Sequence, residues 1–294
     1  MKRVSPLLPL ASLAFLAACA TSSGPAAQPA PEPLACREIE GLTPLLAPGR
    51  VLLLGDMHGT VEIPAFAGNA ACLALKAGRP VTLALEIPRS NQAQVDVFLA
   101  SEGTAADRQA VIDSPFWADA YQDGRRSEAM LALLDEARRL RRQGRPIRVA
   151  LVDWDRSYGG QERDRAMGEA LATAARQARA EGGVLISMAG NAHSRITRGT
   201  PWSSDYDPAG FVMVREAPDL SVTALEVAYA EGTAWTCTSN EVDSCGARPL
   251  RGRGDAQGGR IVLHPEVKNG HHGLFHIGPP TASPPAVQTA PSGS

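Results

Sequence analysis

The amino-acid sequence predicts an α/β protein with a mainly parallel central sheet, and three features of its patterning support this class. The first is a set of short, wholly apolar runs, typical of strands that are buried on both faces: Val51–Leu54, Val81–Leu85, Ile147–Val152 and Val184–Met188. The second is a set of longer segments with apolar residues at helical spacing, each ending at glycine: 63–78, 126–144 and 161–183. The third is their alternation along the chain, which predicts helices on both faces of the sheet.

The chain after residue 200 has a different pattern. Its strand-like runs are "GFVMV", "SVTALEVAY" and "GRIVL", with turns between them. We therefore expect antiparallel additions at the sheet edge in the C-terminal third. In the later segment "HPEVKNGHHGLFHIG", the adjacent histidines His271 and His272 would point to opposite faces of a strand and could not easily share one metal-ligand set. We expect a solvated hairpin there, with incidental metal affinity as the alternative.

The two ends of the chain differ in composition from the 34–278 region, which is expected to form one domain. Residues 1–18 have a positive start and an apolar run too short to span a bilayer, so they predict an export signal. The sequence Leu16-Ala17-Ala18-Cys19 resembles a lipobox, which predicts that Cys19 is lipidated and anchors an outer membrane lipoprotein facing the periplasm. An ordinary secretory signal is the alternative. Residues 19–33 suit a flexible tether, and 279–294 are expected to be disordered.

The net charge indicates which classes of partner the protein can bind, and the cysteine content indicates whether its compartment is oxidising or reducing. The formal net charge of −2 leaves no basic footprint for nucleic acid. Four cysteines besides Cys19 favour disulfides in an oxidising compartment. Of the three connectivities, Cys36–Cys72 with Cys237–Cys245 is preferred because the second pair closes a short loop. A cysteine metal site is disfavoured because Cys-x-x-Cys spacing is absent from the sequence.

Polar residues follow each of the four apolar runs at the point where the predicted strand ends. They are Asp56 and His58 after the first run, Glu86 after the second, Asp153 and Asp155 after the third, and His193 after the fourth. In an open α/β sheet, the carboxyl ends of parallel strands lie along one edge, where ligand sites form. If these strands are neighbours, two histidines, a glutamate and up to three aspartates converge on one crevice.

Each histidine closes a Gly-x-x-His turn, at residues 55–58 and 190–193. Glycine permits a sharp turn after a strand, and the imidazole can act as a general base near neutral pH or bind a metal. Nearby carboxylates can complete a divalent metal site or orient an imidazole. Asn191 either fixes its turn or donates a hydrogen bond to a developing oxyanion.

Four segments carry a resemblance to known proteins: "LLLGDMHGTVE", "LEIP", "RDRAM" and "MAGNAHS". In this order they resemble the superfamily that joins erythromycin esterase-like hydrolases, ChaN-like haem-binding lipoproteins and Tiki/TraB-type metalloprotease-like proteins. The resemblance covers about Val51–Ser194, with a weaker echo in 273–286. It implies an α/β fold with both Gly-x-x-His turns at the site, and the lipoprotein signal fits the ChaN-like branch.

The resemblance also implies roles for particular residues. His58 and His193 are the paired histidines, Glu86 is the glutamate after the second strand, and Arg163 begins an Arg-x-x-x-Met pattern that faces the site. One position departs from the pattern. Many members have glutamate where this chain has Asp56, and the shorter side chain changes the reach of the carboxylate by one methylene.

The leading functional hypothesis is a hydrolase of ester or amide bonds in a small molecule or peptide. In it, His58 activates a water, directly or on a bound divalent metal (Mn, Co or Zn) held by His58, Asp56, Glu86 and His193. His193 and Arg163 stabilise the charge that develops on the substrate. The rival is a non-catalytic haem- or iron-binding lipoprotein that acts as a homodimer, with a tyrosine or histidine as axial ligand. The available tyrosines are Tyr158, Tyr206 and Tyr229. A third hypothesis is an envelope scaffold.

Overall fold

The computed structural model describes residues 33–154 and 160–287. The predicted leader and tether, including Cys19, lie outside the described residues, as do Asp155 and Tyr158. Among the helices of the described part, none is both long and apolar enough to cross a bilayer.

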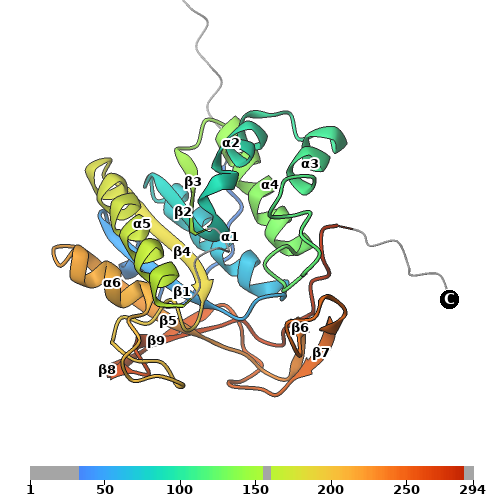
Figure 1. The fold of residues 1–294 in the computed structure, drawn as a ribbon. Coiled ribbons are helices and arrows are strands. Elements are labelled where there is room, and N and C mark those ends of the chain that lie inside the picture. The colour runs from blue at the N-terminus through green and yellow to red at the C-terminus, as the bar shows by residue number, and fades with distance from the viewer. Residues whose placement is uncertain (1–32, 155–159, 288–294) are drawn as a thin grey trace, which may run out of the picture. The chain divides into compact units, whose positions relative to one another are not determined.

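A seven-stranded sheet with the strand order β3-β2-β4-β1-β5-β9-β8 runs through the described residues (Figure 1). The strands are β1 (Arg50–Asp56), β2 (Val81–Pro88), β3 (Ile147–Asp153), β4 (Val184–Gly190), β5 (Ser221–Ala228), β8 (Arg260–Lys268) and β9 (His271–His276). All neighbours pair in parallel except β8 and β9, which are antiparallel at the edge. The mainly parallel sheet with an antiparallel edge confirms the predicted fold class.

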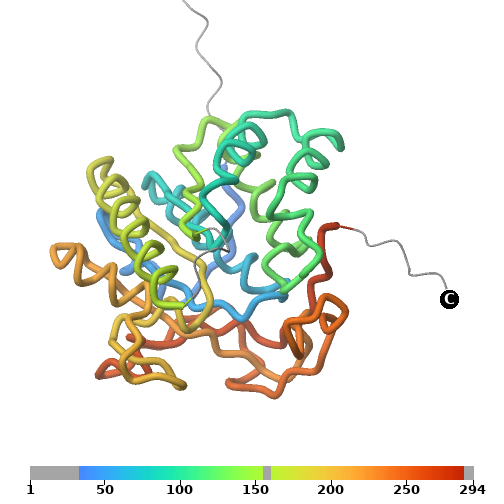
Figure 2. The backbone as a smooth tube through the Cα atoms, in the orientation of Figure 1, coloured from blue at the N-terminus to red at the C-terminus, as the bar shows by residue number. Residues whose placement is uncertain are grey.

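Helices cover both faces of this sheet, as Figures 1 and 2 show. They are α1 (Glu62–Lys76), α2 (Gln92–Ala100), α3 (Ala105–Ile112), α4 (Glu128–Arg142), α5 (Gln161–Ala180) and α6 (Ala209–Glu216), with short 3-10 helices at Thr43–Leu46, Arg89–Asn91 and Val242–Ser244. Because side chains alternate along a strand, β1 contributes to two cores. Leu52 and Leu54 pack on the α1 and α4 side, and Val51 and Leu53 pack with α5 and α6.

Two expectations for the C-terminal third are wrong. "GFVMV" belongs to α6 and not to a strand, because residues 209–216 bury Val212 and Met213 in the core beside α5. A short apolar run does not distinguish a strand from a buried helix, so tertiary packing decides. "SVTALEVAY" does form a strand, but β5 lies inside the sheet, parallel to both β1 and β9.

The expected disorder from Pro279 is also wrong for residues 279–287. This proline-rich strap exchanges backbone hydrogen bonds with the loops that it crosses: Val61 N donates to Thr281 O, and Ser283 N donates to Gly59 O. Ser283 and Ala286 are buried. A low hydrophobic content predicts disorder for a segment that stands alone. Here the rest of the domain provides the hydrogen-bond partners and the packing surface that hold the segment in place. Residues 288–294 lie outside the described part.

Both preferred disulfides form. Cys36–Cys72 ties the N-terminal segment to α1, and Cys237–Cys245 joins β6 (Gly232–Cys237) to β7 (Cys245–Leu250) in a separate antiparallel hairpin. The histidine-rich segment is not wholly solvated, because His271 and His276 are buried in β9 between β5 and β8. His271 Nε2 lies 2.9 Å from Ser194 Oγ.

Candidate active site

The ends of four neighbouring strands bring the predicted residues together. Asp56 at the end of β1 pairs in register with Gly190 at the end of β4, and Gly190 N donates to Glu86 Oε2 at 2.7 Å. A methyl group built on Gly190 would lie 3.4–3.6 Å from His193, His58 and Glu86. His58 Nε2 lies 3.5 Å from Glu86 Oε2, and His193 Nε2 lies 3.9 Å from Glu86 Oε1. The two turns therefore meet around one buried carboxylate, whose side chain is 4% exposed.

Each histidine is oriented by a buried aspartate. His58 Nδ1 lies 2.6 Å from Asp56 Oδ2, and His193 Nδ1 lies 2.8 Å from Asp164 Oδ1. Asp164 is fixed in turn by the hydroxyl of Tyr206, which donates to Oδ2 at 2.6 Å. Because Nδ1 of each ring faces its aspartate, the Nε2 atom of each ring lies on the side of Glu86. The side chains of His58 and His193 remain 25% and 18% exposed, so both rings are partly accessible to solvent.

Two arginines complete the site. Arg163, in the first turns of α5, donates to Glu86 Oε1 at 2.6 Å and to Asp153 through Nε and Nη2 at 2.7 Å each. Arg125, in the loop before α4, donates to Asp153 at 3.0 Å and to Glu86 at 3.3 Å. Asp123 holds the other side of Arg125 at 2.7 and 3.0 Å. Glu86 and Asp153 are thus bridged by two guanidinium groups.

The charges around His58 determine its protonation. Burial lowers the pKa of His58, but the carboxylates of Asp56 and Glu86 outweigh burial and raise this pKa from 6.5 to about 9. The imidazole is therefore protonated at neutral pH. A protonated ring donates a proton more readily than it takes one from water, so this charge environment disfavours His58 as the base, and its role stays a prediction.

His193 has a different hydrogen-bonding pattern. Burial lowers its pKa, Glu86 and Asp164 raise it, and Arg163 opposes them, with a net rise from the ordinary value. Arg163 Nη1 lies 3.0 Å from His193 Nε2. Because arginine only donates, this contact is a hydrogen bond when Nε2 carries a lone pair and the proton is on Nδ1, facing Asp164. Arg163 therefore favours the neutral form of His193, in opposition to the carboxylates that raise its pKa.

The carboxylate between the histidines is firmly ionised. Burial raises the pKa of Glu86, but His58, His193 and both arginines more than compensate and hold it well below its usual range. Burial likewise lowers the pKa of Arg125 and Arg163, while Glu86 and the neighbouring aspartates raise both above the ordinary arginine value. Each charge stabilises its partners.

The predicted metal ligands do not fit a divalent cation. Across residues 33–154 and 160–287, no group of three or more His, Cys, Asp or Glu side chains is arranged to hold a metal ion. Glu86 accepts hydrogen bonds from Arg163 and Arg125, which would repel a cation. Asp56 Oδ1 is buried with no hydrogen-bond partner in the described part, but one oxygen does not make a metal site. Metal dependence stays a prediction for experiment.

Some candidates lie away from this centre. The Asn191 side chain fixes its turn, because Oδ1 accepts from Val227 N at 3.4 Å. Of the tyrosines considered as haem ligands, Tyr206 donates to Asp164 and Tyr229 is buried in the core. Neither presents a free hydroxyl to a haem iron, and the haem alternative stays a prediction without geometric support.

The site also contains three residues that the sequence did not predict to lie there. Asp164 directly follows Arg163, and its position in the first turn of α5 was the only signal for it. Asp123 and Arg125 come from "QDGRRSE", in the stretch between α3 and α4, where no strand end marks them. Their role is visible only once the chain is folded.

Comparisons with known proteins support the fold. A scan of protein families and a search of curated proteins find no match to this sequence. Among solved structures, a succinoglycan biosynthesis protein is similar with a TM-score of 0.55 and 11% identity, covering 79% of this chain and 88% of that one. A histidine-to-asparagine mutant of the erythromycin esterase EreC, in its open conformation, gives a TM-score of 0.51 and 12% identity, covering 82% of this chain and 89% of that one.

At these identities the likeness establishes the fold and not the family. One of the similar structures is an erythromycin esterase, which is among the groups that the sequence motifs resemble. The fold is therefore one that an esterase also uses. Because one fold hosts many activities, the function has to be argued from the site.

Proposed function

We propose that this protein hydrolyses ester or amide bonds with two histidines and no metal. The observation that carries the proposal is the pair of Asp–His units that face one buried glutamate. An aspartate on Nδ1 sets the orientation of an imidazole and leaves Nε2 for proton transfer. Arg163 on Nε2 favours the neutral form of His193, while the carboxylates around His58 favour its protonated form, so the same site can supply one base and one acid.

His193 is the proposed base. Substrate binding would draw Arg163 toward the carbonyl oxygen and leave the Nε2 lone pair of His193 to a water. Nε2 takes a proton from this water as its oxygen bonds to the carbonyl carbon, and Arg163 stabilises the oxyanion. Protonated His58 then donates its Nε2 proton to the leaving alcohol or amine as the carbon–heteroatom bond breaks.

The test is hydrolysis of a panel of esters, lactones and amides by the full-length chain. His193→Ala and His58→Ala are each expected to lower kcat about 10²–10⁴-fold, the usual contribution of a general acid or base. His264→Ala, on the edge strand β8 outside the site, is the matched control and should keep full activity. Hydrolysis that survives in both site variants, or no hydrolysis of any panel member, would overturn the proposal.

Metal dependence is tested in the same assay. We expect EDTA to leave kcat unchanged, because two arginines already bond to Glu86 and Asp153. Loss of activity with EDTA, restored by Mn²⁺, Co²⁺ or Zn²⁺ alone, would return the reaction to the metal-dependent class.

We also propose that lipid on Cys19 anchors the chain to the outer membrane, on the support of the sequence before residue 34. Expressed in a bacterium with an outer membrane, the full chain should incorporate labelled palmitate and sediment with membranes. Cys19→Ala should lose the label completely and appear in the soluble periplasmic fraction. Cys36→Ser with Cys72→Ser is the control and should keep the label. Labelled Cys19→Ala protein would contradict the anchor.

A further inference from the structure

The loop at residues 116–126 brings Asp123 and Arg125 to the site without regular secondary structure of its own. It lies between α3 and α4 and consists of turns and bends. Arg125 nevertheless meets Asp153 at 3.0 Å and Glu86 at 3.3 Å. A side chain holds such a geometry only when the backbone beneath it is fixed.

Contacts within the loop itself hold part of this backbone in place. Arg126 is buried and donates through Nη1 to Tyr121 O and to Asp123 Oδ1, at 2.9 Å each. Its guanidinium lies 4.4 Å from the centre of the Phe116 ring. These contacts set the curvature of the loop.

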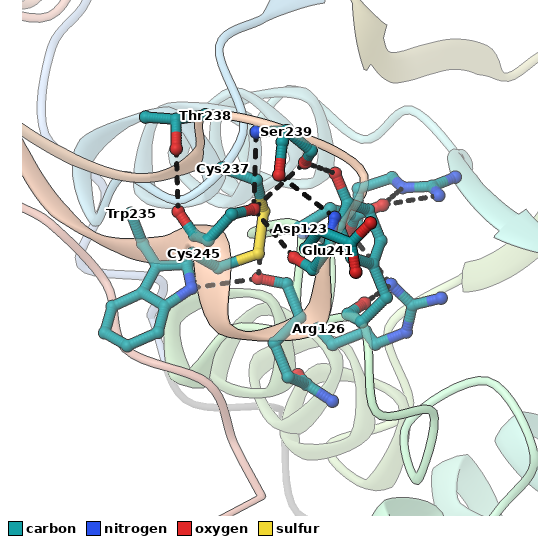
Figure 3. The surroundings of a disulfide bond; sticks show 12 residues. Asp123, Arg126, Trp235, Cys237, Thr238, Ser239, Glu241 and Cys245 are labelled. Atoms are coloured by element: carbon teal, nitrogen blue, oxygen red, sulfur yellow. Dashed lines mark hydrogen bonds and ion pairs between the residues drawn. A yellow bond between two sulfur atoms is a disulfide. The ribbon is translucent and has the colours of Figure 1, made fainter.

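The outer side of the loop is held by the β6–β7 hairpin. Trp235 Nε1 donates to Gln122 O at 2.9 Å, and Tyr121 Oη donates to Ser239 O at 3.0 Å. Cys237 Sγ lies 3.8 Å from the same Gln122 carbonyl. Figure 3 shows Asp123 and Arg126 among the residues around the Cys237–Cys245 disulfide, which closes the hairpin at this end.

The same hairpin contacts the turn that carries His58. Trp235 N donates to Gly59 O at 2.9 Å. Gly59 has a φ of +78°, and a Cβ on it would lie 2.1 Å from Trp235 O. Gly124 has a φ of +90°, and a Cβ on it would lie 2.7 Å from Gly59 N. The His58 turn, the Arg125 loop and β6 thus meet backbone to backbone, at a distance that only glycine permits.

We propose that the β6–β7 hairpin is a positioning element of the candidate active site, and that its disulfide keeps Arg125 against Glu86 and Asp153. The hairpin is a two-stranded sheet separate from the central one, and Cys237 and Cys245 are only partly buried. Its order therefore depends strongly on the disulfide, since a two-stranded hairpin alone is marginally stable. The effect on catalysis rests on the proposed function; the effect on loop order does not.

The experiment compares two double variants of the full chain. Cys237→Ser with Cys245→Ser should speed hydrogen exchange of amides 117–126 about tenfold. Cys36→Ser with Cys72→Ser, at the other disulfide, should leave those amides unchanged. In the hydrolysis assay the hairpin variant should lose about 10–100-fold in kcat/KM, the scale of a misplaced group. Trp235→Phe keeps an aromatic ring but removes the hydrogen bond to Gln122. It should also speed exchange at 117–126 and lower kcat/KM, each by less than the loss of the disulfide does.

A second comparison distinguishes positioning of Arg125 by the hairpin from a general loss of stability of the domain. If the hairpin acts through Arg125, then breaking its disulfide costs no further activity in an Arg125→Ala background. Independent, multiplicative losses would overturn the proposal, as would exchange that rises equally over the whole domain or not at all at 117–126. If the unaltered protein hydrolyses no substrate, the proposed function fails, and exchange at 117–126 alone decides this inference.

Discussion

Replacing Glu86 with alanine is expected to lower the free energy of unfolding by about 3–5 kcal/mol and to abolish hydrolysis. Glu86 is the buried anion that both arginines and both histidines face. Without it, Arg163 keeps Asp153 as its carboxylate partner, Arg125 keeps Asp153 and Asp123, and both arginines lose the anion between the histidines. Gly190 N also loses its acceptor. Breaking a buried ion pair leaves uncompensated charge, which costs far more than loss of a surface pair.

Urea unfolding monitored by circular dichroism measures this effect. Glu86→Gln retains the shape and a hydrogen-bond acceptor for Gly190 N but removes the charge, so we expect an intermediate loss of stability. Glu102→Ala is the control, because this glutamate is paired with Arg142 on the surface and is 70% exposed. It should change stability by less than about 1 kcal/mol. An unchanged midpoint for Glu86→Ala would contradict the charge network described for the site.

The part of the site that lies on the central sheet could be predicted from the sequence. Runs of apolar residues locate the strands, and parallel neighbours necessarily end at the same edge. That argument is enough to bring His58, Glu86 and His193 into one place. It needs no knowledge of side-chain contacts, because the sheet itself fixes the spacing.

The remaining members depend on long-range packing that leaves no local pattern. Arg125 reaches the site from a loop in which Gln122 O accepts a hydrogen bond from Trp235, more than a hundred residues later. The protonation of His58 could not be predicted either, because its pKa depends on the distances to Asp56 and Glu86. The role of His58 as base or acid depends on this pKa, whereas its location follows from the strand ends alone.

The failed expectations outside the site have a similar cause. "GFVMV" has the composition of a strand, but residues 209–216 are helical and pack beside α5. The 279–287 strap has the composition of a disordered tail, yet its backbone bonds to Gly59 and to other loops. In both cases the deciding contacts come from residues far away in the sequence, which local composition does not record.

Protonated His58 is expected to make both stability and activity fall as the pH rises through about 9. The pKa of His58 is raised from 6.5 in the unfolded chain to about 9 in the folded one, so the folded state binds the proton more tightly. The resulting stabilisation, on the order of 3 kcal/mol, is fully present below pH 6.5 and is lost as the pH passes about 9. Above that pH, kcat/KM should fall about tenfold per pH unit because the proposed acid is missing.

The charge of Asp56 provides the test of this cause. Burial opposes protonation of His58, and Asp56 is the strongest of the groups that favour it. Asp56→Asn should therefore lower the pKa of His58 and move the alkaline limb of the kcat/KM profile to lower pH by about 1–3 pH units. NMR titration of the His58 ring measures the pKa directly. Asp219→Asn, which removes a surface carboxylate paired with Arg179, is the control and should leave the profile in place. An alkaline limb that does not move in Asp56→Asn would remove His58 from the role of acid.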